Sequence, residues 1–306
     1  TLRLWGDGAV DSARRVCRIL NAPFYYINLE RDFQRHVVDY FCHEYSQGRT
    51  PNPCIICNRD IKFGFLLNLP QAFGAHYLAT GHYVRVERRG EKYYLLKGAD
   101  PRRDQSYFLY TLGQRELTHL LFPIGGYGKS EVRLMAAKRG LPSSQVVESR
   151  ELCFIADGDY RRFLSQRLPP QPGDIVDVAG KVLGRHEGLA FYTIGQRQRL
   201  GLYARERLYV VGMDPVHNRL IVGAGEELLR DSLSATEVNF VSGEELQEPT
   251  SVTAKIRYQS PQVEATLYPH GSGIRVQFSK PQRAIAPGQA VVFYQDEVIL
   301  GGGVIA

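Results

Sequence analysis

The feature that most constrains the fold of this chain is a change of hydrophobic pattern near Gly173. Before it, short apolar strands alternate with amphipathic helices, in the order 2–5, 10–20, 23–29 and 32–45. This alternation predicts a parallel sheet with helices on both faces, and ligands at the carboxyl ends of its strands. After Gly173, short alternating strands are broken by Gly, Pro and Asp, which is typical of a small antiparallel barrel or sandwich.

The two patterns divide the 306-residue chain into three predicted domains. An α/β domain with a parallel nucleotide-binding sheet takes residues 1–160, a small β-rich central domain takes 161–228, and a C-terminal antiparallel β-barrel takes 229–306. The first domain should also contain a helix at 58–69 and a strand at 77–80 that ends at Gly81. The strands expected in the second half are 174–178, 190–194, 208–213, 219–222, 252–258, 263–268, 273–278, 290–294 and 298–304.

The chain carries 38 Lys and Arg against 32 acidic residues, a formal net charge of +6. This mild excess suits a polyanionic partner, because cations near phosphates release condensed counterions, although a basic housekeeping enzyme can have the same charge. No apolar run approaches the roughly 20 residues that span a bilayer. The first residues also lack the pattern of a secretory signal. The sequence therefore predicts a cytoplasmic protein that does not interact with a membrane.

Five cysteines in a chain of this length do not form the dense framework of a disulfide-rich secreted protein. Cys17 and Cys42 lie on apolar faces of predicted helices, which fits inert core thiols. Cys57 has a different setting, near the first turn of a predicted helix and close in sequence to Arg59 and Lys62. Helix N-termini and nearby cations lower the pKa of a thiol and favour the reactive thiolate.

The remaining thiols are consistent with three kinds of site. Cys54 and Cys57 could be half of a zinc site, but the chain offers no second pair of ligands, which disfavours zinc. Cys54, Cys57 and Cys153 could instead hold a [4Fe-4S] cluster with one iron left open. In the third reading, Cys57 and Cys153 are a pair of working thiols, and the residue pattern leaves this reading and the cluster open.

Six motifs of this chain resemble motifs of the tRNA-specific 2-thiouridylases, and they occur in the same order as in that family. The motifs are Gly48-Arg49-Thr50-Pro51-Asn52-Pro53 with Cys57-Asn58, Thr80-Gly81-His82-Tyr83, Lys97-Gly98 with Asp100, Asp104-Gln105-Ser106-Tyr107-Phe108-Leu109, Cys153-Phe154-Ile155 with Gly158-Asp159-Tyr160, and Tyr192-Thr193-Ile194-Gly195-Gln196-Arg197. Leu121-Phe122-Pro123 before a glycine turn also matches. The resemblance runs nearly the whole chain and implies an adenine nucleotide alpha hydrolase-like first domain.

The resemblance implies an ATP-dependent tRNA sulfurtransferase that thiolates the wobble uridine, with Mg²⁺ accompanying ATP. ATP adenylates the 2-oxygen of the uridine, Cys153 carries a persulfide loaded by a cysteine desulfurase or relay protein, and Cys57 attacks it to leave a Cys57–Cys153 disulfide. Asn52, Pro53 and Cys54 match the segment that contacts the target base. Several family members carry Asp at the position of Cys54, so the role of this residue depends on the choice between persulfide and cluster.

Further residues match binding positions of the family. Leu2 and Gly81 match ATP contacts, and His82 with the loop Arg103-Asp104-Gln105 matches tRNA contacts in the first domain. In the barrel, Arg257, Tyr258 and Gln289 match tRNA contacts. An Arg beside a Tyr can pair with phosphate while the ring stacks on a base, although spacing alone would favour an ordinary strand with a solvated Arg.

The phosphate loop of this enzyme class is not recognisable in the chain. Residues 7–13 imitate it, but Asp7 would repel phosphate and Ala9 replaces a glycine. The helix at 10–20 matches the second helix of the family, so we expect the ATP loop to precede Thr1. Two other functions compete. One is a different adenylating enzyme of the same superfamily, which would leave Cys57 and Cys153 without a purpose. The other is a tRNA-binding module without ATP chemistry.

Overall fold

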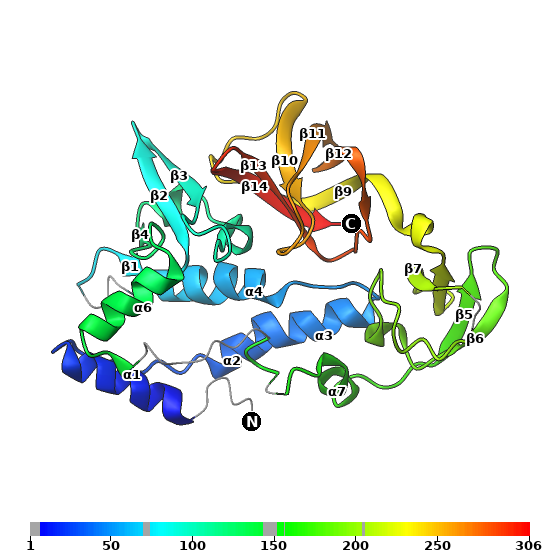
Figure 1. Ribbon diagram of the computed structural model, residues 1–306, viewed down its shortest axis with the longest axis horizontal. Coiled ribbons are helices and arrows are strands. Elements are labelled where there is room, and N and C mark those ends of the chain that lie inside the picture. Colours follow the sequence, from blue (N-terminus) through cyan, green and yellow to red (C-terminus); the bar gives the residue numbers. More distant parts are fainter. Residues whose placement is uncertain (1–6, 70–73, 143–151, 156, 204–205) are drawn as a thin grey trace.

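The computed structural model describes residues 7–69, 74–142, 152–155, 157–203 and 206–306. A mainly helical first part carries a small β-hairpin, a four-stranded sheet lies at one end, and a barrel of long strands lies over the helix labelled α4 (Figure 1). The main helices of the first part are α1 (Asp7–Ile19), α2 (Glu30–Phe33), α3 (Asp39–Ser46), α4 (Pro53–Ile56), α5 (Gln114–Leu117) and α6 (Lys129–Lys138), and α7 (Tyr160–Ser165) follows.

The first helices agree with the sequence pattern. The helix predicted at 10–20 is confirmed as α1, which begins earlier, at Asp7, and therefore covers the residues that imitate a phosphate loop. α2, a π-helical turn η1 (Gln34–Val38) and α3 form one continuous helix where residues 32–45 predicted it. It ends just before Gly48, which has a φ of 70°. The predicted strand at 2–5 lies outside the described residues.

The predicted buried strand at residues 23–29 is wrong. This segment forms no strand, and the side chains of Tyr25, Tyr26 and Ile27 are 61%, 66% and 42% exposed. A strand needs a neighbour to pair with its backbone, and no described strand runs beside this segment. The apolar pattern alone could not show whether that neighbour was present.

The parallel sheet is confirmed, but its described part is short. β1 (Leu78–Ala79) pairs in parallel with β4 (Leu120–Leu121), and β1 falls where the strand at 77–80 was predicted. An antiparallel hairpin, β2 (Val84–Arg89) and β3 (Lys92–Lys97), was not predicted. Its strand β3 meets β14 of the barrel through Leu96 and Val298, so the barrel sheet continues into the first part of the chain.

The C-terminal barrel has the predicted antiparallel form. Its strand order is β13-β10-β11-β12-β9-β14, and pairing of β13 with β14 closes it. The strands are β9 (Leu229–Phe240), β10 (Thr250–Lys255), β11 (Val263–His270), β12 (Gly273–Arg283), β13 (Ala290–Gln295) and β14 (Val298–Ile305). Fully buried side chains such as Leu267, Val276 and Phe293 fill the interior. Such burial is what the alternating pattern of these strands predicts.

The small central sheet has the order β6-β5-β8-β7, from β5 (Gly173–Asp177), β6 (Val182–His186), β7 (Tyr209–Asp214) and β8 (Arg219–Gly223). The strand predicted at 190–194 is wrong, because Leu189–Phe191 forms a 3₁₀ turn. Phe191 and the next residue, Tyr192, are both buried, and successive side chains of a strand would point to opposite faces. None of the helices in the described part of the chain combines the length and apolar composition that a membrane crossing requires.

Candidate active site

The helix that carries Cys54 and Cys57 begins earlier than the sequence predicted. It starts at Pro53 rather than near Asn58, with Asn52 in an extended conformation before it. Proline suits the first helical position because its fixed φ is helical and its missing N–H would have no partner there. The helix continues as the π-helical segment η2 (Cys57–Phe65) and a 3₁₀ turn, η3 (Leu66–Asn68). Cys54 therefore lies in the first turn and Cys57 in the second.

The structure brings Cys153 to Cys54 and Cys57, from which it is far apart in sequence. Cys54, Cys57 and Cys153 are all free, and Cys57 is the least exposed of them. Burial is the main cause that raises the pKa of each thiol, and a charge on Cys153 would raise the pKa of both Cys54 and Cys57 further. Lys62 acts on all three in the opposite direction. These mutual effects place the three thiols and Lys62 in one neighbourhood.

The expectation that Cys57 has a lowered pKa is wrong. Burial raises the pKa of Cys57 to about 11, and the attraction of Lys62 offsets only part of that rise. Arg59, the other expected cation, faces the barrel instead. Its guanidinium donates to Asp60 at 2.7 Å and lies 3.7 Å from a carboxylate oxygen of Glu237. Cys57 is thus a protonated thiol at neutral pH in this state.

We expect the alkylation of Cys57 by iodoacetamide to accelerate about tenfold per pH unit between pH 7 and 9, because only the thiolate reacts. With a pKa near 11, the rate should reach no plateau in this range. The measurement is the labelled fraction of the Cys57 peptide over time, by mass spectrometry. A plateau near pH 8 would show that the thiol is activated in the free protein, contrary to this prediction.

Cys153 is held in place by the two residues that follow it. The side chains of Phe154 and Ile155 are buried in the same core as α3. The Phe154 ring lies 5.3 Å from the ring of Phe41 and 5.3 Å from that of Phe163, measured between centroids. An exposed thiol on a chain with such an anchor has a restricted position relative to Cys57.

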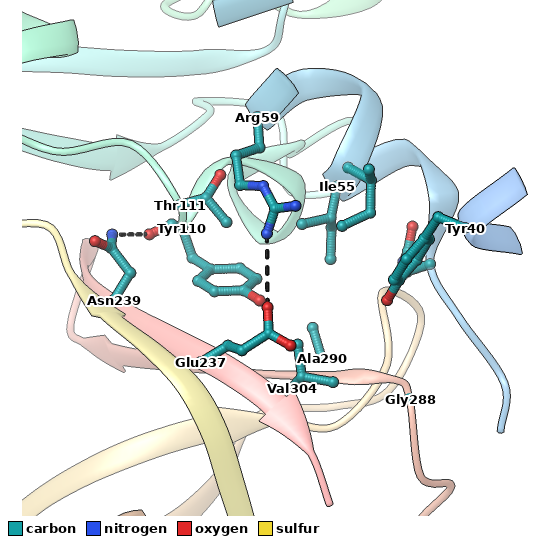
Figure 2. A pocket seen from close by; sticks show the side chains of 12 residues that line it. Tyr40, Ile55, Arg59, Tyr110, Thr111, Glu237, Asn239, Gly288, Ala290 and Val304 are labelled. Atoms are coloured by element: carbon teal, nitrogen blue, oxygen red, sulfur yellow. Dashed lines mark hydrogen bonds and ion pairs between the residues drawn. The ribbon is translucent and has the colours of Figure 1, made fainter. Parts of the chain in front are cut away.

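A cavity of about 150 Å³ lies on the barrel side of the same helix (Figure 2). Asn52 and Arg59 line it from the helix, Tyr40 from α3, and Glu237 and Asn239 from β9. The other lining residues are Ile55, Ile56, Tyr110, Thr111, Gly288, Ala290 and Val304. Figure 2 shows the Arg59–Glu237 ion pair within this lining. Burial, followed by repulsion from Glu44 and Glu237, raises the pKa of Tyr40 to about 12, so its hydroxyl stays protonated.

The chain is similar to known proteins over nearly its whole length. Three family models match in chain order: a tRNA methyl transferase HUP domain at residues 6–157, a tRNA methyl transferase PRC-barrel domain at 161–224, and an aminomethyltransferase beta-barrel domain at 230–305. The chain is 49% identical to the tRNA-specific 2-thiouridylase MnmA of Moorella thermoacetica, over 97% of this chain and 85% of the relative. The corresponding proteins of Roseiflexus sp. and Clostridium perfringens are 46% and 44% identical, over 97% of this chain and 85% and 84% of theirs.

The chain belongs to the tRNA-specific 2-thiouridylase family. This membership confirms the resemblance seen in the motifs and the α/β, β-rich and barrel architecture. It also makes a transferase the class of enzyme to which the chain is related. The roles of individual 2-thiouridylase residues in this chain stay predictions, and their positions in the structure follow.

Gly81 and His82, two of the predicted ligand residues, lie near the end of strand β1 in the first part of the chain. Gly81 follows β1 at the carboxyl end of the parallel sheet, where such folds bind ligands. His82 is buried, with its Nδ1 2.8 Å from the hydroxyl of Thr80 and its ring near those of Phe63 and Phe122. Burial and then Lys62 lower the pKa of His82 to about 3, so the ring is neutral. Leu2 lies outside the described residues.

The loop Arg103-Asp104-Gln105 is organised by its own side chains. The Asp104 carboxylate accepts hydrogen bonds from the backbone N–H of Gly98 at 2.9 Å and from the hydroxyl of Ser106 at 2.8 Å. The side-chain oxygen of Gln105 accepts from the backbone N–H of Tyr83 at 2.9 Å. Asp104 and Gln105 therefore shape this loop of the 2-thiouridylase, and their contact with tRNA stays a prediction.

The three predicted barrel residues lie at the boundary with the rest of the chain. Tyr258 packs on Phe108 with ring centroids 4.5 Å apart. The Arg257 guanidinium donates to the backbone oxygens of Ala284 and Ile194. The side-chain amide of Gln289 donates to the backbone oxygens of Thr50 and Pro51, in the segment before Cys54. Arg257 is therefore not the solvated strand Arg that spacing alone favoured, and burial lowers its pKa.

Some residues of the site could not be selected from the sequence. Glu237 and Asn239 line the cavity, yet they lie in an ordinary strand pattern with no motif around them. Thr193 was inside a quoted motif but had no role, and its hydroxyl lies 3.4 Å from that of Thr50. Among the described residues, no group of three or more His, Cys, Asp or Glu side chains is placed to hold a metal ion. This holds for Cys54, Cys57 and Cys153 as well, so their placement gives no support to the [4Fe-4S] reading.

Proposed function

We propose that this chain is an ATP-dependent tRNA sulfurtransferase that converts the wobble uridine of tRNA to 2-thiouridine. The observation that carries the proposal is the convergence of Cys57 and Cys153, 96 positions apart in the sequence, within a chain of this family. The basic net charge of +6 suits a tRNA substrate. We propose three domains: a catalytic domain at residues 1–160, a central domain at 161–228 and a tRNA-contacting barrel at 229–306.

The first step is adenylation of the base. The 2-oxygen of uridine attacks the α-phosphate of ATP and pyrophosphate leaves, which makes the oxygen part of an AMP leaving group. Gly81 and Leu2 are the proposed ATP contacts, and Asn52, Pro53 and Cys54 are the proposed contacts to the base. We also propose that the protein is cytoplasmic and that a cysteine desulfurase or relay protein supplies its sulfur.

The second step transfers sulfur. The terminal sulfur of a Cys153 persulfide, supplied by the donor protein, attacks C2 of the base, and AMP leaves with the C–O bonding electrons. The Cys57 thiolate then attacks the Sγ atom of Cys153. The S–S bond to the transferred sulfur breaks, its electrons remain on the base as the thiocarbonyl, and a Cys57–Cys153 disulfide forms. An external dithiol must reduce this disulfide before the next turnover.

The raised pKa of Cys57 is compatible with this order of events. A protonated thiol does not attack a persulfide before the substrate is in place. The adenylated base is positively polarised. Once this base is in place, loss of the proton from Cys57 would produce the thiolate nucleophile. Lys62 is the cation that lowers the pKa of both Cys57 and Cys153. It would stabilise the negative charge that develops on sulfur.

The test is to incubate the protein with tRNA, ATP and a persulfide-generating desulfurase, and to measure 2-thiouridine and AMP. We expect equal amounts of the two products. Release of AMP without thiouridine would favour another adenylating enzyme, and tRNA binding with neither product would favour the module without ATP chemistry. The [4Fe-4S] alternative on Cys54, Cys57 and Cys153 predicts in addition that thiolation depends on bound iron.

A further inference from the structure

The segment before the cysteine helix, residues 48–52, is held by the barrel. The backbone N–H of Thr50 donates to the backbone oxygen of Pro287 at 2.7 Å. The side-chain amide of Gln289 donates to the backbone oxygens of Thr50 at 2.9 Å and Pro51 at 3.4 Å. The Arg49 guanidinium donates to the backbone oxygen of Ile305, the penultimate residue of the chain.

The fit between the two segments is close at Gly288. Its φ is 87°, a conformation that side chains with a Cβ rarely adopt. A Cβ at this position would lie 3.0 Å from the nitrogen of Thr50 and 3.1 Å from the Cβ of Arg49. The barrel loop 284–289 therefore approaches the segment at backbone distance.

The same segment also contacts the central sheet. A Cβ on Gly48 would lie 3.2 Å from the sulfur of Met213, and the Thr50 hydroxyl lies 3.4 Å from that of Thr193. All three parts of the chain thus meet on residues 48–50. From there only Pro51 and Asn52 precede Pro53, the first residue of the helix, and the two fixed prolines transmit the position of the junction with little slack.

The geometry points to Gln289 as a positioning residue for sulfur transfer, which acts through the backbone of Thr50 and Pro51 on the placement of Cys57. This inference rests on the proposed function and deepens it. Gln289 was matched to a tRNA contact, but both of the hydrogen bonds that its side chain makes to described residues go to this segment of its own chain. A change at Gln289 should therefore slow the chemical step at saturating tRNA rather than weaken tRNA binding.

The experiment compares Gln289→Met with Gln282→Met. Methionine keeps the length of the side chain and removes the N–H donors. Gln282 is a matched control in the same barrel, because within the described part of the chain its side-chain amide donates only to the nearby backbone oxygen of Lys280. Thiouridine formation is measured under single-turnover conditions at saturating tRNA, and tRNA affinity is measured separately by filter binding.

We expect Gln289→Met to lower the single-turnover rate about tenfold, because small misplacement of a reacting group is costly. Its Kd for tRNA should change less than twofold, and Gln282→Met should match wild type in both. Gln289→Glu should be slower still, since its carboxylate would face two carbonyl oxygens. A raised Kd with an unchanged rate would overturn the inference and assign Gln289 to tRNA binding alone, and wild-type values for both quantities would also overturn it.

Amide hydrogen exchange separates this inference from the proposed function. In the protein without tRNA, exchange of residues 49–57 should be about tenfold faster in Gln289→Met than in wild type, while strands β10 to β12 keep their protection. Unchanged exchange in 49–57 would show that Gln289 does not hold the segment. Failure of wild type to form thiouridine would instead count against the proposed function and leave this exchange result standing.

Discussion

Replacing Cys153 or Cys57 by serine is expected to lower tRNA thiolation by at least about a thousandfold, as removal of a covalent catalyst does in other enzymes. Serine at 153 cannot carry a persulfide, and serine at 57 cannot release the sulfur by forming a disulfide. Neither change should disturb the adenylation step. Each variant should therefore keep tRNA-dependent exchange of pyrophosphate into ATP near the wild-type rate.

The measurement is nucleoside analysis of tRNA by mass spectrometry after reaction with each variant. Cys17→Ser and Cys42→Ser are the controls, because neither thiol is among the causes that shift the pKa of Cys54, Cys57 or Cys153. Both controls should thiolate at the wild-type rate. Thiolation by Cys153→Ser at more than a few hundredths of the wild-type rate would contradict the persulfide route.

Cys54→Ser decides between the two sulfur chemistries. In the persulfide route Cys54 has no covalent role, so the variant should retain activity within about tenfold, reflecting its proposed place against the base. In the cluster route all three thiols are ligands, so activity and any iron-dependent absorbance should be lost together. The second result would replace the mechanism proposed above.

Much of the architecture could be predicted from the sequence because it depends on local pattern. The barrel strands alternate buried and exposed positions, and α3 buries Phe41 and Tyr45 on one face, so their periodicity was visible. The predictions of strands at 23–29 and 190–194 were wrong for a related reason. A run such as Pro23 to Leu29 is apolar in any setting, and whether it pairs depends on a neighbour that the run does not specify.

The reactive state of the thiols could be predicted only in part. The sequence shows cations beside Cys57, but it does not show how many protein atoms surround the sulfur, and burial outweighs Lys62 in raising its pKa. The sequence also cannot show which way a side chain points. Arg59 is two residues from Cys57, yet it pairs with Glu237 across the cavity (Figure 2). The bonds of Gln289 to Thr50 join residues 239 positions apart, which no local pattern reveals.

The second large effect is expected at Phe154. Replacing it by alanine should lower the free energy of unfolding by about 3–5 kcal/mol, because it leaves a cavity among buried aromatic rings. Phe154 is 7% exposed and packs edge-on against the rings of Phe33, Phe41 and Phe163. Urea unfolding of the wild type and the variant measures the difference.

Phe163→Ala is the matched control, because Phe163 belongs to the same ring cluster and is 8% exposed, but it is not next to a cysteine. Both variants should lose stability by similar amounts, and Phe154→Leu should lose less. Only Phe154→Ala should also slow oxidation of Cys57 and Cys153 to their disulfide under conditions where all variants are folded, by about tenfold. Equal slowing in Phe163→Ala would mean that the whole core positions Cys153, whereas no slowing in either would mean that Phe154 stabilises the fold without directing the thiol.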